Sequence, residues 1–432
     1  MFKFLFEKLE KILKNIDQST LRGEYKVKIY RLYALPSVRY HFSIHHIQQV
    51  HIDKLDTIAR SYLKKWLQIP KNGCTDLAIF HPFLLGLKTP SQIYKEGHAG
   101  NYALMRFKGD KLVNHALDSR LEREQQWSRK FSTIKYADKI YQNRTNHKPK
   151  EHLLKKVIKK SVREDQKIIW DTKAKNLTFQ GEFTRLLIEE KNNITWQSFK
   201  NNIPKGILSF ALKSTTNTLN TPDNLRRWGV RKIGKCLLCG NKNADLQHIL
   251  QWCPIPLKQG RYTWRHDSIL CYLTKYFKEN IDTNILEIFA DLPKMRINGG
   301  TIPADILVTG ERPDLVIINR SSKEIFILEL TCSFETNVDQ AHHRKNTKYN
   351  DLVSDIKRNN YKVTLISFEV GSRGHISPRN NINIKNILKI TKSKGNYQKI
   401  IQEIAKISLL CSYTIFKSYT QKEWNDPPYI HP

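Results

Sequence analysis

The sequence predicts a multidomain fold in which helices precede a small metal-binding module and a C-terminal α/β domain. Apolar residues recur at helical spacing in the N-terminal part of the chain. A cluster of cysteine and histidine residues follows at residues 236–253. Two short β-branched runs joined by a polar turn lie at residues 314–331. A chain of 432 residues is long enough for two or three such domains.

The composition indicates a polyanionic partner. The formal net charge is +33, and the 73 lysine and arginine residues are spread along the chain. A surplus this large repels itself unless a partner neutralises it, and a nucleic-acid backbone would do so. The alternative interpretation is a soluble basic protein from an AT-rich genome, whose codons favour lysine.

The seven cysteines favour metal binding over disulfide bonds, because their number is odd and three of them are clustered. No apolar run approaches the length of a membrane span, and the amphipathic N-terminus differs from the apolar core of a signal peptide. We therefore expect an intracellular protein in a reducing compartment, with no membrane partner.

Residues 1–100 are predicted to form a helical domain. Apolar residues at helical spacing predict a helix over residues 1–16, which could pack into a core or lie on a membrane surface; we expect core packing. Residues 17–23 are expected to break this helix. Two more helices are expected at about residues 24–35 and 47–67, separated by Pro36 and ended at Pro70.

Residues 101–205 are predicted to form a basic helical linker. Its lysines and arginines are interleaved with aromatic residues, namely Trp127, Tyr136, Tyr141, Trp170 and Trp196. Aromatic rings among cations can stack on nucleic-acid bases. They can equally anchor helices to each other, which is the commoner use. Residues 143–150 are expected to form a loop.

Residues 206–285 are predicted to hold a zinc site with the spacing C-x2-C-x8-H-x4-C. The candidate ligands are Cys236, Cys239, His248 and Cys253, with Gly240 at the turn. Four such ligands close a tetrahedral shell around Zn²⁺ and leave no open position, which predicts a structural site. The alternative is a set of free buried thiols beside an unrelated histidine.

A group of cations with one tryptophan comes just before the zinc motif. It consists of Arg226, Arg227, Trp228, Arg231 and Lys232. Guanidinium groups suit phosphates and an indole ring suits the face of a base, so we predict a nucleic-acid contact here.

Two carboxylates are predicted to meet across a β-hairpin. Symmetry about the turn at residues 320–323 places Asp314 opposite Glu329, and opposed residues have Cβ atoms only about 5 Å apart. Such a pair suits a hard divalent ion such as Mg²⁺, to which Glu287 or Asp305 could add a carboxylate. The alternative is a turn-flanking aspartate and a glutamate paired with a surface lysine. The apolar neighbours of Glu329 favour the metal, because burying an unpaired carboxylate is costly.

A helix with two lysines is predicted after the hairpin. Residues 337–359 can form an apolar stripe, and Lys345 and Lys348 lie three residues apart on one helix face. A third strand is expected at residues 363–370. Residues 286–432 would then form a β-β-α-β domain with carboxylates at one edge and lysines on the adjacent helix.

This arrangement resembles the PD-(D/E)xK nuclease superfamily, through Pro313-Asp314, Glu329 and a lysine. The usual lysine position, two residues after the glutamate, holds Thr331 in this chain. The restriction-like endonucleases of site-specific non-LTR retrotransposons take the lysine from the following helix, and the chain resembles that subgroup. The zinc motif and the basic residues just before it are similar to the knuckle that precedes the endonuclease in the same proteins. The segment Arg261–Ile269 resembles their post-knuckle helix, in which we expect His266 to be a backbone or surface partner rather than a ligand.

The resemblance extends into residues 1–100, where the stretch from Leu21-Arg-Gly-Glu24 to Leu84-Leu-Gly-Leu-Lys-Thr-Pro90 is similar to the thumb that follows the polymerase palm in those retrotransposon proteins. The aromatic-Ala-Asp-Asp polymerase motif has only an approximation here, at residues 136–139, where lysine replaces the second aspartate. The chain therefore looks like the C-terminal half of such a polyprotein, without polymerase activity.

The resemblance implies a Mg²⁺-dependent endonuclease that nicks target DNA for target-primed reverse transcription. Asp314 and Glu329 would hold Mg²⁺, Lys345 or Lys348 would assist the reaction, and Zn²⁺ would be structural. The expected partners are target DNA and the element RNA, and the expected location is the nucleus. Two alternatives are a catalytically inactive nucleic-acid-binding remnant and a structural assembly subunit.

Overall fold

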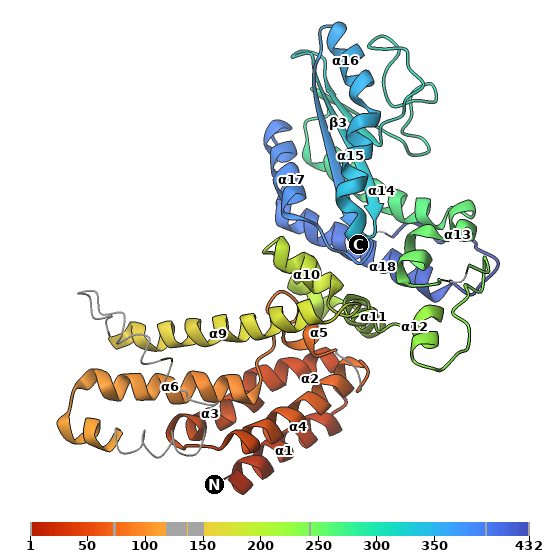
Figure 1. Cartoon of the computed structure of the whole chain (residues 1–432). Helices are drawn as coiled ribbons and strands as arrows, with labels where there is room; N and C mark the ends of the chain where they lie inside the picture. Colours follow the sequence, from red (N-terminus) through yellow and green to blue (C-terminus); the bar gives the residue numbers. More distant parts are fainter. Residues whose placement is uncertain are drawn as a thin grey trace. The chain divides into compact units, whose positions relative to one another are not determined.

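The computed structural model describes residues 2–71, 75–117, 136, 151–241, 243–393 and 395–430. The chain divides into two compact units, residues 1–185 and 186–432 (Figure 1). The described part of the first unit is helical, and the second combines helices with a small sheet. The structure is thus a mostly helical multidomain protein, as the sequence predicts. No described helix is both long and apolar enough to span a bilayer.

The first unit is built from amphipathic helices that bury one apolar stripe each. Leu5, Leu9 and Leu13 of the first helix are fully buried. The described elements of this unit are α1 (Phe2–Gln18), α2 (Gly23–Ile29), the π-helical turn η1 (Tyr30–Ala34), α3 (Leu35–Ile44), α4 (Gln49–Leu67), α5 (Asp76–Phe80), α6 (Pro90–Lys108) and α9 (Glu151–Asn176). The chain passes from this unit to the next within α10 (Glu182–Glu189).

Pro36 does not separate two helices, so that prediction is wrong. α2 leads through η1 directly into α3, in which Pro36 is the second residue. A proline inside a helix removes one backbone hydrogen bond, and its ring clashes with the carbonyl four residues earlier. The π-helical turn just before Pro36 shifts the hydrogen-bond register where this clash would occur. The break predicted at residues 17–23 is also shorter, because α1 continues to Gln18.

The described aromatic residues of the predicted linker anchor helices. Tyr136 is buried beside Ala99 of α6 and Ile158 of α9. Trp170 stacks on Phe80, with ring centroids 5.6 Å apart. Trp196 is fully buried. The predictions for Trp127, Tyr141 and residues 143–150 lie outside the described residues.

The second unit contains a four-stranded sheet flanked by helices. After α10 its described elements are the 3-10 helix η2 (Thr195–Asn202), α11 (Lys205–Thr215), α12 (Pro222–Arg227), the π-helical turn η3 (His248–Trp252), α13 (Pro254–Lys258), α14 (Arg261–Asn280), β1 (Leu286–Ala290), β2 (Leu315–Asn319), β3 (Glu324–Ser333), the 3-10 turn η4 (Glu335–Asn337), α15 (Val338–Lys348), α16 (Asn350–Arg358), β4 (Lys362–Gly371), α17 (Pro378–Ile390) and α18 (Tyr397–Lys417).

The strands lie in the order β1-β2-β3-β4. β1 and β3 run antiparallel to β2, and β4 runs parallel to β3. In the β2–β3 hairpin Asn319 pairs with Glu324 and Leu315 with Leu328, which confirms the predicted register. The parallel step from β3 to β4 requires a crossover, and helices α15 and α16 provide it. The sequence predicted one helix there, but the chain divides it into two at Tyr349.

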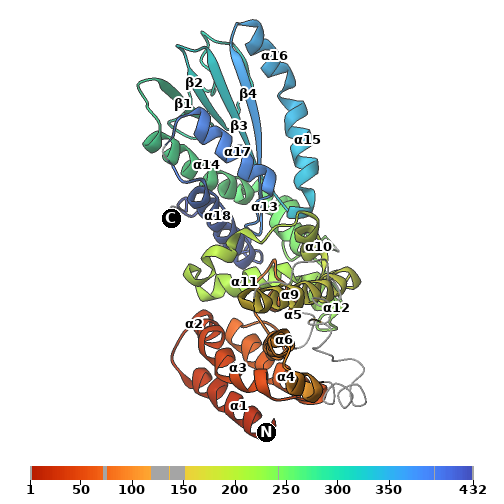
Figure 2. The same ribbon diagram turned by 90° about the vertical axis from the view of Figure 1, so that its left-hand side faces the viewer.

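α15 and α16 cover one face of the sheet, while α14, α17 and α18 lie on the other (Figure 2). The core under α16 joins Val316 and Ile318 of β2 and Ile325 and Ile327 of β3 to Ile356. Side chains alternate along a strand. Asp314 and Glu329 therefore lie on the same face of the sheet as these core residues, toward α15.

Candidate zinc centre and carboxylate site

The four predicted zinc ligands come together in the second unit. Cys236 and Cys239 flank a tight turn, in which the Gly240 N–H donates to the Cys236 carbonyl at 3.0 Å. Gly240 has a φ of 74°, which glycine adopts without a steric penalty. His248 begins the turn η3, and Cys253 directly precedes α13.

The spacing of the ligand atoms fits a tetrahedral zinc ion. All four atoms lie within 4.8 Å of one another. Cys236 Sγ is 3.8 Å from Cys253 Sγ, and Cys239 Sγ is 3.4 Å from His248 Nε2. Zn–S bonds of about 2.3 Å and Zn–N bonds of about 2.0 Å give tetrahedral edges of roughly these lengths. Three of the four ligands are buried, as expected of a structural site.

Neighbouring groups hold the zinc ligands in place. The Asp245 carboxylate accepts from the His248 N–H at 2.7 Å, and the Tyr262 hydroxyl accepts from the Cys253 N–H at 3.2 Å. Burial lowers the pKa of His248, so its imidazole is neutral and can donate a lone pair. Burial raises the pKa of the Cys253 thiol to about 12, so zinc must displace a proton there.

A second group of polar residues, the carboxylate site, lies at the start of β2. It is beside the part of β3 that extends beyond the last pair of the β2–β3 ladder. The Asp314 N–H donates to Glu329 Oε2 at 3.1 Å, and the Leu330 N–H donates to Asp314 Oδ2 at 2.8 Å. These reciprocal bonds fix both carboxylates beside each other. Both residues are buried, with exposed fractions of 7% for Asp314 and 1% for Glu329.

Lys345 is the lysine that reaches the carboxylates. Its Nζ lies 2.5 Å from Glu329 Oε1 and 3.9 Å from Asp314 Oδ2. Lys348 instead contacts Glu311 at 3.1 Å and lies over the Tyr349 ring. The sequence left the choice between the two lysines open, and the structure brings only Lys345 to the pair.

Neither additional carboxylate that the sequence offered joins this group. Glu287 and Asp305 both contact Arg320, next to the hairpin turn. Arg320 follows β2, whereas Asp314 precedes it, so the length of that strand separates the two groups.

His266 approaches the carboxylates from α14, which the sequence did not predict. Its Nε2 lies 3.3 Å from Asp314 Oδ2, and its Nδ1 lies 2.9 Å from Asp267. His266 is not among the ligands of the described Cys/His cluster, as expected, but its partners are the side chains of Asp267 and Asp314 rather than backbone groups. Its position depends on the packing of α14 against β3, which no local sequence pattern encodes.

Opposite charges organise the electrostatics of this group. Burial acts to raise the pKa of Asp314, but His266, Lys345 and the Leu330 N–H lower it below the usual value. Burial and the Asp314 charge raise the pKa of Glu329. Burial acts to lower the pKa of His266, but Asp267 and Asp314 raise this pKa well above the usual value. An ionised Asp314 beside cationic groups is an arrangement that can bind a metal ion or act on a phosphate.

A further polar chain runs beside this group on the same face of the sheet. His342 Nδ1 lies 2.7 Å from Glu369 Oε1, and a hydrogen bond of 2.9 Å joins His342 Nε2 to Asn346. In the β3–β4 ladder Ser367 pairs with Glu329, which places Glu369 next along that face. The sequence could not reveal this proximity, because it depends on the parallel pairing of distant strands.

Comparison with known families supports the zinc centre. Residues 179–258 match the family model described as zinc-binding in reverse transcriptase. This range includes all four ligands of the Cys/His cluster. The match supports a reverse-transcriptase-related protein that binds zinc. No curated protein matches the chain.

The basic group before the zinc ligands lies within the matched range. Asp223 contacts Arg226 at 2.8 Å and Arg227 at 3.2 Å, which orders these two guanidinium groups on α12. Trp228, Arg231 and Lys232 are exposed. The structure thus keeps the five residues on one short segment, and their contact with nucleic acid stays a prediction.

Proposed function

We propose that this chain is the Mg²⁺-dependent DNA endonuclease portion of a retrotransposon reverse-transcriptase protein, with a structural zinc centre beside it. The observation that carries the proposal is the contact of Asp314, Glu329 and Lys345 at the strand ends. The match to a zinc-binding family of reverse transcriptases supports the element origin. The net charge of +33 supports a nucleic-acid substrate.

The donor chemistry of the carboxylate pair suits magnesium. Mg²⁺ prefers oxygen ligands and binds through one or two carboxylates together with water and phosphate oxygens. Asp314 and Glu329 would hold the ion, and the positive charge of Lys345 lies beside Glu329. A bound Mg²⁺ would lower the pKa of water and neutralise charge on the phosphate.

The residues of the chain would support hydrolysis of one phosphodiester bond. The oxygen of water forms a bond to phosphorus while the bond from phosphorus to the 3′ oxygen breaks. The water proton passes to a base, and the leaving 3′ oxygen takes up a proton. Lys345 would stabilise the charge that develops on the phosphate, and His266 would hold Asp314 in place. The products are a 3′-hydroxyl and a 5′-phosphate.

A plasmid-nicking assay tests the proposal. Supercoiled DNA is incubated with the full chain, with and without Mg²⁺, and the open-circular product is quantified. We expect Asp314→Ala and Glu329→Gln each to lower the nicking rate by at least about 100-fold, the scale seen when a key charge-stabilising group is removed. Zinc content and unfolding midpoint are measured for every variant, so that loss of folding is not mistaken for loss of chemistry.

Three outcomes decide between the candidate functions. Nicking that needs Mg²⁺ and disappears in Asp314→Ala supports the endonuclease. Equal nicking by wild type and folded Asp314→Ala contradicts the assignment. Salt-dependent DNA binding without cleavage at any Mg²⁺ concentration would indicate a nucleic-acid-binding protein that lacks the reaction.

A further inference from the structure

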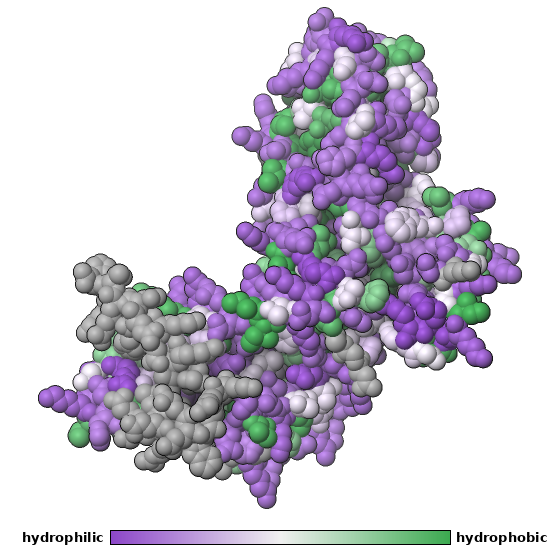
Figure 3. Space-filling view, viewed as in Figure 1, coloured by the Kyte–Doolittle hydropathy of each residue, from purple (hydrophilic) through white to green (hydrophobic). Residues whose placement is uncertain are grey.

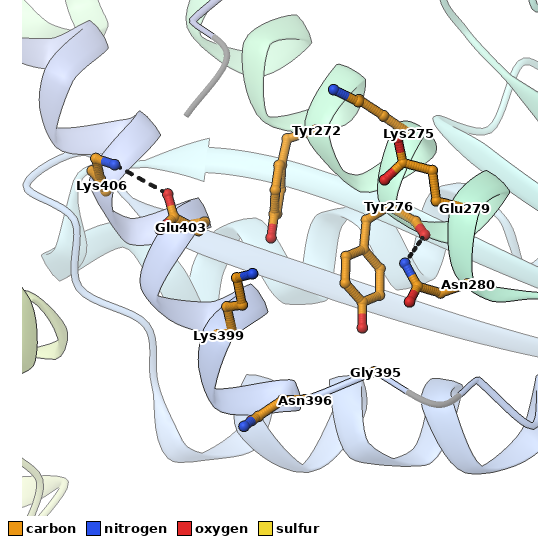
Figure 4. A pocket seen from close by; sticks show the side chains of 10 residues that line it. All are labelled: Tyr272, Lys275, Tyr276, Glu279, Asn280, Gly395, Asn396, Lys399, Glu403 and Lys406. Atoms are coloured by element: carbon orange, nitrogen blue, oxygen red, sulfur yellow. Dashed lines mark hydrogen bonds and ion pairs between the residues drawn. The ribbon is translucent and has the colours of Figure 1, made fainter.

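A cavity of about 570 Å³ lies between α14 and α18, in the same unit as the sheet (Figure 4). α14 lines it with Tyr272 and Tyr276, and α18 lines it with Lys399 and Lys406. This volume lies within the range of roughly 300–1,000 Å³ typical of ligand sites. None of these residues belongs to the zinc centre or to the carboxylate site.

The two tyrosine rings provide aromatic surface inside the cavity. Tyr272 and Tyr276 lie one helical turn apart, with centroids separated by 6.3 Å and planes inclined by 42°. Figure 4 shows both rings projecting from α14 into the space between the helices. A Cβ atom on Gly395 would lie 1.3 Å from the Tyr276 hydroxyl, so a side chain at this position would require the Tyr276 ring to move.

Three lysines line the cavity together with the rings, and Figure 4 shows Lys399 nearest to them. Lys275 and Lys399 have no ion-pair partner among the residues that the structure describes, whereas Lys406 lies 3.3 Å from Glu403. Burial raises the pKa of both tyrosines, so each phenol is neutral and does not repel an anion. The two asparagines of the cavity already bond to backbone groups, Asn280 to the Tyr276 carbonyl and Asn396 to the Gln398 N–H. The rings and the lysines are therefore offered to a ligand together with the carboxylate of Glu279, which also lines the cavity.

We propose that this cavity binds one nucleotide of an unpaired nucleic-acid strand, with the base against Tyr272 and the phosphate at Lys399. Stacking on an aromatic ring needs a base face that is free of its own neighbours, which a single strand supplies and a duplex does not. Aromatic surface beside cations is the combination that binds single strands with little sequence preference. The proposal does not depend on DNA cleavage.

The cavity and the carboxylate site share helix α14. α14 also carries His266, which contacts Asp314. Tyr272 lies six residues further along this helix, a rise of about 9 Å. The cavity is a site of its own, on the face of the sheet that α14 and α18 cover.

Binding is tested with the full chain and a short fluorescein-labelled oligothymidylate, by fluorescence anisotropy without Mg²⁺. We expect Tyr272→Ala to weaken binding on the order of tenfold, because it removes one stacking surface. Tyr272→Phe should restore binding, since it keeps the ring. Lys399→Gln should weaken binding and lower the salt dependence by about one ion. Lys389→Gln is the matched control, because it removes the same charge from an exposed lysine of α17 outside the cavity.

The location of the strand is tested by photocrosslinking. A strand with one 5-iodouracil should crosslink to a peptide that contains Tyr272 or Tyr276, and it should do so equally in the Asp314→Ala variant. Crosslinks confined to other peptides would overturn the proposal. Wild-type affinity in folded Tyr272→Ala would overturn it too. If thymidine monophosphate binds as tightly as the strand, the cavity is a small-molecule site and the proposal is wrong.

Discussion

Lys345 and Lys348 show how a difference of three residues decides the role of a side chain. Both lie on α15, and a pattern of helical spacing assigns them to one face. In the structure Lys345 contacts Glu329, whereas Lys348 contacts Glu311 and the Tyr349 ring. α15 packs against β3 and β4, so the face of the helix that meets the strands determines which amine is near the carboxylates.

We predict that Lys345→Ala lowers Mg²⁺-dependent nicking by about 100-fold, because it removes the cation next to the proposed phosphate position. Lys348→Ala is the matched control and should change the rate less than about threefold. The open-circular product is measured over time at saturating DNA. An equal loss in both variants would show that the lysines act only through general DNA binding.

At the scale of secondary-structure elements, the zinc segment combines two short pieces of chain that have little regular structure. The turn after Cys236 and the π-helical turn η3 direct the zinc ligands toward one point. The hydrophobic cluster around the ligands is small, with Ala244, Leu238 and Ile255 packed beside the cysteines. A core this small needs the metal for its stability.

Removing a zinc ligand should therefore destabilise this segment. Wild-type protein is expected to contain one zinc ion per chain by elemental analysis, and Cys236→Ser to contain much less. Cys271→Ser, on α14, is the control and should keep the metal. Zinc should be released as the pH falls, because protons compete for the thiolates and for the imidazole of His248. Full zinc content in Cys236→Ser would contradict the assigned ligand set.

Asp56 of α4 gives the first unit a pH-dependent stability. The Asp56 carboxylate accepts from the Ser91 N–H at 2.8 Å, at the start of α6. Burial raises the pKa of Asp56 to about 6, whereas an unfolded aspartate titrates near pH ~4. Between these values the folded state binds more protons than the unfolded state, so stability falls as the pH rises from about 4 to about 6.

We expect Asp56→Asn to remove about 3 kcal/mol of this pH dependence, because the neutral amide can still accept from Ser91. The variant should be more stable than wild type at pH 7 and no more stable at pH 4. Urea unfolding of the full chain at both pH values measures the difference. Glu7→Gln, at an exposed position of α1 in the same unit, is the control. An unchanged pH dependence in Asp56→Asn would refute the effect of burial.

At the scale of the whole molecule, charge is the dominant property. The chain carries 73 lysine and arginine residues against 40 acidic ones. Hydrophilic side chains cover most of the face drawn in Figure 3. Each phosphate that a cation neutralises releases counterions, which makes affinity for nucleic acid fall steeply with salt.

We predict that the logarithm of the DNA affinity falls linearly with the logarithm of salt concentration. Replacing Arg231 and Lys232 together by glutamine should reduce the slope by about two, if each contacts a phosphate. Replacing Lys14 and Lys54, two exposed lysines of the first unit, is the charge-matched control. Anisotropy titrations over a salt series give both slopes. Equal slopes for the two pairs would exclude a specific contact near the zinc centre.

The sequence by itself determined the features that depend on neighbouring residues. The zinc ligands follow from spacing within one short segment, and the pairing of Asp314 with Glu329 follows from a symmetric turn. Hydrogen bonding across a hairpin and ligand geometry act over a few residues, so the order of residue types is sufficient to predict them.

Only the tertiary structure decided which side chains surround the carboxylates. Lys345 and His266 reach the carboxylates from α15 and α14, and Glu369 of β4 lies further along the same face of the sheet. Glu287 and Asp305 contact Arg320 instead. The cavity between α14 and α18 has the same origin. These contacts arise from packing between segments far apart in the chain, and packing depends on the fit of whole surfaces rather than on any local pattern.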